Sequence, residues 1–185
     1  MRYPNSLPIG RHVVGASETW RRAGDDLVVA TQVGLVALQS AQGAERSLAM
    51  LELAEVRRRS GAPAECGTLV AQALRLRPDD PATLARARFT VAYMRWWTPG
   101  AARNYEAVRL LGERTETPLT QGVGWLGLAR CSRFTSTGMR PDHIGRARVL
   151  FADDEDAHAD ADREEAAHAL LAGDNERAQI GRAHV

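Results

Sequence analysis

The stretch from Ser47 to Asp80 reads SLAMLELAEVRRRSGAPAECGTLVAQALRLRPDD. Apolar residues recur in it at intervals of three and four, which is the periodicity of an amphipathic helix. Gly61 and Pro63 interrupt the pattern, and Pro78 ends it, because proline lacks the backbone N–H that continues a helix. The stretch therefore predicts two helices, over 47–60 and 64–76, joined by a short link.

The same spacing continues on both sides of this unit. It predicts further helices, separated by short links rich in glycine, proline or aspartate, over 25–40, 81–97, 101–114, 118–134, 142–151 and 162–172. Alanine, leucine and arginine, which favour helices, are frequent, and no segment has the pattern of a strand. Short links bring consecutive helices together as antiparallel neighbours. We therefore expect an all-α fold of antiparallel helical hairpins.

Composition excludes several kinds of chemistry. The 185 residues include no lysine, so a P-loop or a Schiff-base site that needs a lysine amine is not encoded here. Cys66 and Cys131 form no C-x-x-C motif, which argues against a zinc site or a disulfide framework and favours a reducing, cytoplasmic location. No apolar run approaches the length of a membrane span.

The unit over 47–80 resembles a tetratricopeptide repeat, a helical hairpin of about 34 residues. The positions that carry the resemblance are Met50, Leu53 and Ala54 on the first helix and Cys66, Val70, Ala73 and Pro78 on the second. Ala101 with Tyr105 and Ala147 with Phe151 repeat the spacing between a small and an aromatic residue, whereas Arg57 replaces the usual aromatic residue. The resemblance implies hairpins stacked as a right-handed superhelix, an α-solenoid, over residues 17–178, truncated at its C-terminal end.

The stretch ETWRRAGD, residues 18–25, resembles a phrase from large bacterial ATP-dependent transcriptional regulators of the LuxR or SARP type. In those proteins an array of such repeats follows the ATPase part. The resemblance implies a non-catalytic module for effector sensing and protein interaction. The arginines are spread over many helices and interleaved with acidic residues, so we expect no direct contact to nucleic acid. Residues 1–16 are expected to be irregular. The last six residues, 180–185, match the translation of a sequencing adapter, so we expect them to be read-through.

In tetratricopeptide repeats, the first helix of each pair lines the concave side. The candidate groove residues on this basis are Leu51, Glu55, Arg58, Arg59, Arg86, Phe89, Tyr93 and Trp96. Arginine makes paired hydrogen bonds to carboxylates and aromatic rings anchor interfaces, so the expected partner is a peptide or protein segment, including other domains of the same regulator. The competing interpretation is that the arginines form a solvated helix face and that the aromatic residues pack between helices.

Two further patterns suggest ligands. Gly122, Gly124 and Gly127 spell the glycine pattern of a dinucleotide site, but no strand leads into them, so we expect close helix packing and no cofactor. The acidic residues over 153–162, with His158 and His168 nearby, could gather a cation. They define the alternative function, an all-α metal-dependent enzyme, against the interpretation of an acidic turn before a solvated helix. A free-standing repeat adaptor is the third possibility.

Overall fold

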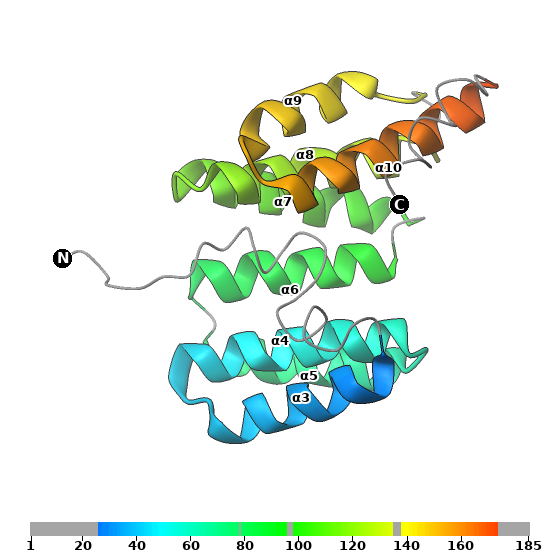
Figure 1. Cartoon of the computed structure of the whole chain (residues 1–185). Coiled ribbons are helices and arrows are strands. Elements are labelled where there is room, and N and C mark those ends of the chain that lie inside the picture. The colour runs from blue at the N-terminus through cyan, green and yellow to red at the C-terminus, as the bar shows by residue number, and fades with distance from the viewer. Residues whose placement is uncertain (1–25, 78, 96–97, 135–137, 174–185) are drawn as a thin grey trace.

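The chain is all-helical throughout the part that the computed structural model describes, residues 26–77, 79–95, 98–134 and 138–173. These residues contain no strand, which confirms the all-α expectation. Along the chain the helices are α3 Leu27–Ser40, α4 Gly43–Arg59, α5 Pro63–Leu76, α6 Pro81–Met94, α7 Pro99–Arg114, α8 Pro118–Ser132, α9 Pro141–Phe151 and α10 Glu155–Ala172 (Figure 1). None of these helices has the length and apolar character needed to cross a membrane.

Three helix bounds differ clearly from the sequence expectation. α6 ends at Met94 rather than at residue 97. The other two differences are at helix starts. α4 begins at Gly43 rather than at Ser47, and α10 begins at Glu155 rather than at Asp162. The difference at α10 has a local cause: the Asp154 carboxylate accepts a hydrogen bond from the backbone N–H of Ala157 at 3.0 Å and caps the helix. The structure thus has the expected acidic turn and capped helix start, but the helix begins earlier than predicted. Glu155 and Asp156 lie in its first turn, where the helix dipole favours negative charge.

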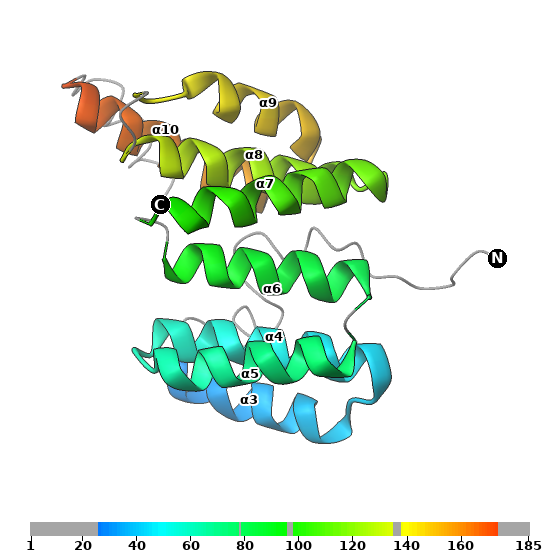
Figure 2. The same ribbon diagram turned by 180° about the vertical axis from the view of Figure 1, so that it is seen from behind.

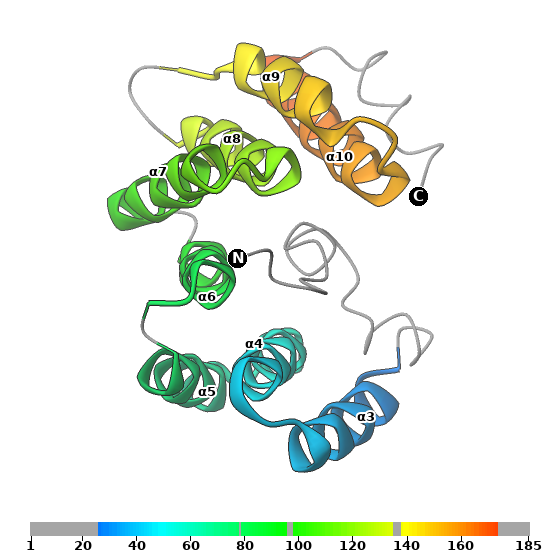
Figure 3. The same cartoon turned by 90° about the vertical axis from the view of Figure 1, so that its left-hand side faces the viewer.

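Each helix packs against the next one in the chain, and alternate helices also touch. Contacts of the second kind join α4 to α6, α6 to α8 and α8 to α10. α3 lies at one end of the row and α9 with α10 at the other, with α6 between them (Figures 1 and 2). In the view of Figure 3 the helices follow an arc, and α4, α6, α8 and α10 lie on its inner side.

The positions that carry the repeat resemblance lie in the core. One apolar cluster contains Met50, Ala54, Cys66, Val70 and Ala73, together with Leu51 and Ala87. Ala101 and Tyr105 belong to a second cluster, and Ala147 and Phe151 to a third. Leu53 is buried as well, whereas Pro78 lies outside the described residues. These positions therefore determine how the helices pack, and they are not available to a partner.

The glycines of α8 allow close approach of its neighbours. A Cβ at Gly127 would overlap the ring of Tyr105 on α7, and one at Gly122 would lie 2.6 Å from Cε1 of Phe151 on α9. A Cβ at Gly124 would collide with the backbone of Arg109. The expectation that these glycines serve close helix packing is confirmed.

Candidate functional site

Charged and aromatic side chains from the four helices on the inner side of the arc form a continuous chain of contacts. We call this set the polar seam. Its members are Glu55, Arg58 and Arg59 of α4, Arg86, Phe89 and Tyr93 of α6, Arg130 of α8 with Arg133 at the C-cap of that helix, and Glu164 and His168 of α10. The seam includes most of the groove residues predicted from the sequence, and it extends them to α8 and α10.

At the α4 end of the seam, Glu55 is held by arginines of its own helix. Its carboxylate accepts hydrogen bonds from Arg58 at 2.6 and 2.8 Å and from Nε of Arg59 at 3.1 Å. Burial by itself would raise the pKa of Glu55, but the hydrogen bond from Arg58 and the charges of Arg58, Arg86 and Arg59 lower it. Glu55 is therefore an ionised, buried carboxylate whose oxygens are already occupied.

Tyr93 connects the two ends of the seam. The guanidinium carbon of Arg58 lies 4.3 Å from the centroid of the Tyr93 ring, and that of Arg130 lies 4.8 Å from it. Both distances are within the range of cation–π attraction. The ring of Phe89 lies 5.8 Å from that of Tyr93 and 6.0 Å from that of Tyr105. The seam thus combines cationic groups with an aromatic surface.

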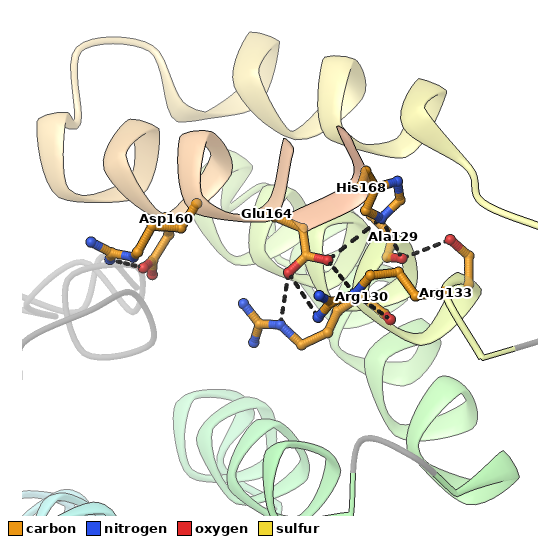
Figure 4. Close-up of polar contacts among 8 residues, drawn as sticks. Ala129, Arg130, Arg133, Asp160, Glu164 and His168 are labelled. Atoms are coloured by element: carbon orange, nitrogen blue, oxygen red, sulfur yellow. Dashed lines mark hydrogen bonds and ion pairs between the residues drawn. The ribbon is translucent and has the colours of Figure 1, made fainter. Parts of the chain in front are cut away.

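At the α10 end, Glu164 ties two helices together (Figure 4). Nε of Arg130 donates to Oε2 of Glu164 at 3.0 Å, while Nε of Arg133 and Nε2 of His168 lie 3.0 and 3.5 Å from Oε1. Nε2 of His168 also lies 3.1 Å from the carbonyl oxygen of Ala129 and donates to it. Burial opposes ionisation of Glu164, but the hydrogen bond with His168 and the charges of Arg130 and Arg133 lower its pKa. This cluster joins α10 to α8.

Arg86 differs from the other arginines of the seam. It is 3% exposed, and its Nε is buried without a hydrogen-bond partner among the described residues. Its guanidinium carbon lies 6.0 Å from the centroid of the Phe89 ring. Burial lowers the pKa of Arg86, the charges of Glu55 and Glu52 oppose this effect, and the two neighbouring arginines of α4 reinforce it. Arginine stays protonated in proteins, so a buried positive charge lies here with incomplete compensation.

The structure corrects one predicted groove residue and leaves another outside its range. Leu51 has no exposed surface, because it packs with Cys66 and Val70 in the apolar cluster, so it cannot contact a partner. Trp96 lies outside the described residues. The sequence analysis did not identify the α8 and α10 members of the seam. The signal was available: Arg130 and Arg133, like Glu164 and His168, have the spacing that places two side chains on one helix face.

The acidic residues over 153–162 do not converge on a common point. Asp154 caps α10, Asp160 pairs with Arg163 of its own helix, and Asp162 pairs with Arg148 of α9 at 2.6 Å. Across the described ranges, no group of three or more histidine, cysteine, aspartate or glutamate side chains is placed to hold a metal ion. These carboxylates cap a helix and form ion pairs.

A cavity of about 520 Å³ lies between α9 and α10, and its lining is largely apolar. Its charged lining residues, Arg148 and Glu165, pair with each other at 2.7 Å. Its histidine, His168, belongs to the Glu164 cluster. Because the two charged groups of this cavity are already paired with each other, the seam is the stronger candidate for recognition.

The comparisons with known proteins identify no relative. The chain matches no protein-family model, no curated protein and no solved structure. Its function is therefore inferred from the geometry of the seam, which combines arginines, aromatic rings and a buried guanidinium with incomplete compensation.

Proposed function

We propose that the chain is a non-catalytic helical-repeat module that binds an acidic segment of a partner protein along the polar seam. The observation that carries this proposal is the charge of the seam, which contains five arginines and two glutamates. Arginine makes bidentate hydrogen bonds to carboxylates, so a surplus of arginine on one face favours an acidic ligand. Phe89 and Tyr93 offer apolar surface beside those charges.

The helix arrangement supports an α-solenoid of the tetratricopeptide type. Contacts between consecutive and alternate helices are those of a row of hairpins in which each unit touches its neighbours. Links as short as 60–62 and 115–117 favour antiparallel neighbours. In such an array the inner side is the extended surface on which peptides bind. The helices that carry the seam, α4, α6, α8 and α10, lie on this side (Figure 3).

We further propose that the module is the sensing and interaction arm of a cytoplasmic bacterial regulator of the LuxR or SARP type. The support is the resemblance of residues 18–25 and of the repeat unit over 47–80 to such proteins. In this role the acidic segment belongs to another domain of the same regulator or to a protein that it senses. The seam needs no metal and no cofactor for such recognition.

Fluorescence polarisation with a labelled peptide of repeated Glu-Tyr-Gly, and with its Lys-Tyr-Gly counterpart, tests the proposal. The unmodified protein is expected to bind the glutamate peptide selectively, with an affinity that falls as salt is added. Arg58→Gln with Arg59→Gln is expected to weaken binding about 10-fold or more, because hydrogen bonds to charged groups contribute roughly 1.5–3 kcal/mol each.

The matched control carries the same charge change on the outer helices. Arg75→Gln with Arg103→Gln removes two exposed arginines from α5 and α7. It is expected to leave the affinity within about 2-fold of that of the unmodified protein, since screened surface charges contribute little. Equal binding of the glutamate and lysine peptides, or equal losses in the two double variants, would overturn the proposal.

A further inference from the structure

We propose that Arg86 is the anchor of the seam: its guanidinium receives a carboxylate of the bound acidic segment, which supplies the counter-charge that the free protein lacks. This inference rests on the proposed function and deepens it, because it names the residue and the chemical group of the ligand that it recognises. The arginines of the seam then fall into two groups. Four of them pair with Glu55 or Glu164, and the fifth, Arg86, binds the partner.

The surroundings of Arg86 explain why it remains unpaired. Glu55 and Glu52 on the adjacent helix attract it electrostatically. The oxygens of Glu55, however, already accept the hydrogen bonds of Arg58 and Arg59. A guanidinium has five N–H donors in a planar fork, and this fork fits two carboxylate oxygens. An incoming carboxylate therefore meets a guanidinium whose Nε has no hydrogen-bond partner among the described residues.

The burial of Arg86 has a cost that packing alone does not justify. A buried charge without a partner loses its hydration, and an apolar side chain of similar volume often gives a more stable protein. The positions beside it on α6, Ala85 and Ala87, are fully buried and apolar, so the helix has no general need for charge here. Residues that act in binding often reduce the stability of the free protein. The burial of Arg86 with an unpartnered Nε fits this pattern.

The neighbours of Arg86 suit an acidic protein segment better than a small anion. Phe89 follows it by three residues and Tyr93 by seven, so all three share one side of α6. The rings of Phe89 and Tyr93 are half-buried, which leaves aromatic surface next to the guanidinium. A peptide can place a carboxylate on Arg86 and an apolar side chain on the rings, whereas a free oxyanion uses only the first contact.

The test combines a binding measurement with a stability measurement on the full chain. Arg86→Met is compared with Arg88→Met, which removes an exposed arginine two positions away on the same helix. For Arg86→Met we expect at least a 10-fold loss of affinity for the Glu-Tyr-Gly peptide and an unchanged or higher urea midpoint of the free protein. Arg88→Met is expected to change neither quantity, and Arg86→Lys is expected to recover part of the affinity.

The possible outcomes separate the two proposals. If the unmodified protein does not prefer the glutamate peptide over its lysine counterpart, the proposed function fails. If it does prefer that peptide but Arg86→Met binds it equally well, only the role of Arg86 is overturned. A lower urea midpoint for Arg86→Met overturns it too, because the residue is then a structural counter-ion. Displacement of the peptide by inorganic phosphate at equal concentration would assign Arg86 to a free oxyanion instead.

Discussion

Glu55 and Glu164 are both buried carboxylates beside arginines, but their partners lie on different elements. Arg58 and Arg59 follow Glu55 by three and four residues on the same helix. Arg130 of α8 and Arg133 at the C-cap of that helix precede Glu164 by 34 and 31 positions. The ion pairs of Glu55 therefore stay within α4, while those of Glu164 connect α10 to α8. Glutamate–arginine pairs thus stabilise the packing of α10 at one end of the seam. At the other end they occupy the oxygens of Glu55 and leave Arg86 without a hydrogen bond to that carboxylate.

The largest expected effect is on stability, and it separates the two glutamates. Glu164→Gln removes the carboxylate charge that pairs with Arg130 and Arg133, whose side chains are only 16% and 15% exposed. We expect a loss of about 3–5 kcal/mol in the free energy of unfolding. Glu55→Gln is expected to cost about 1–2 kcal/mol, because Arg59 is 32% exposed and can turn to solvent. Urea denaturation measures both, and equal losses would contradict the comparison.

The labelling rates of the two cysteines measure local opening at the two ends of the seam separately. Cys66 packs against α4 and Cys131 lies in α8. Cys66 and Cys131 are buried, and burial raises the pKa of each thiol to about 11, so labelling at neutral pH requires local opening. Glu164→Gln is expected to increase the labelling rate of Cys131 about 10-fold or more and that of Cys66 less. Mass spectrometry after a thiol-reagent pulse follows each site. Parallel increases at both cysteines would show that the ends open together.

The smallest expected effect is the acid dependence of stability. The folded-state pKa values of Glu55 and Glu164 are lowered, so their contribution is complete above the unfolded value of about 4.3 and is lost as the pH falls through the folded value. Stability is therefore expected to fall on acidification below about pH 5. Denaturation of Glu164→Gln at a series of pH values should give a flatter curve than that of the unmodified protein. A curve of equal slope would assign the acid sensitivity to other carboxylates.

Much of the fold followed from local pattern. The spacing of apolar residues identified every helix that the structure describes, and the repeat-like positions such as Ala54 and Tyr105 are in the core, as their size predicts. Leu51 was wrongly placed in the groove because periodicity gives the apolar side of a helix but does not say which neighbour covers it. The start of α10 was missed because its polar first turns depend on the Asp154 cap.

The site depended on contacts that are distant along the chain. The rule that first helices line the inner side identified Arg58, Arg86 and Tyr93, since it needs only the order of the helices. The contact of Arg130 with Glu164 joins residues in different helices, α8 and α10, and no local signal specifies it. The same holds for the isolation of Arg86, because its missing partner is a property of the space around it and not of its neighbours in sequence.

The sequence by itself therefore determined the helices and the positions that pack them, because backbone hydrogen bonds within a helix and apolar periodicity act over a few residues. Only the tertiary structure decided which charges are neutralised. Electrostatic pairing depends on distance and burial in space, and these are set when separate helices come together. For this reason Glu164 forms ion pairs that connect two helices, whereas Arg86 is a buried cation that we propose binds a carboxylate of the partner.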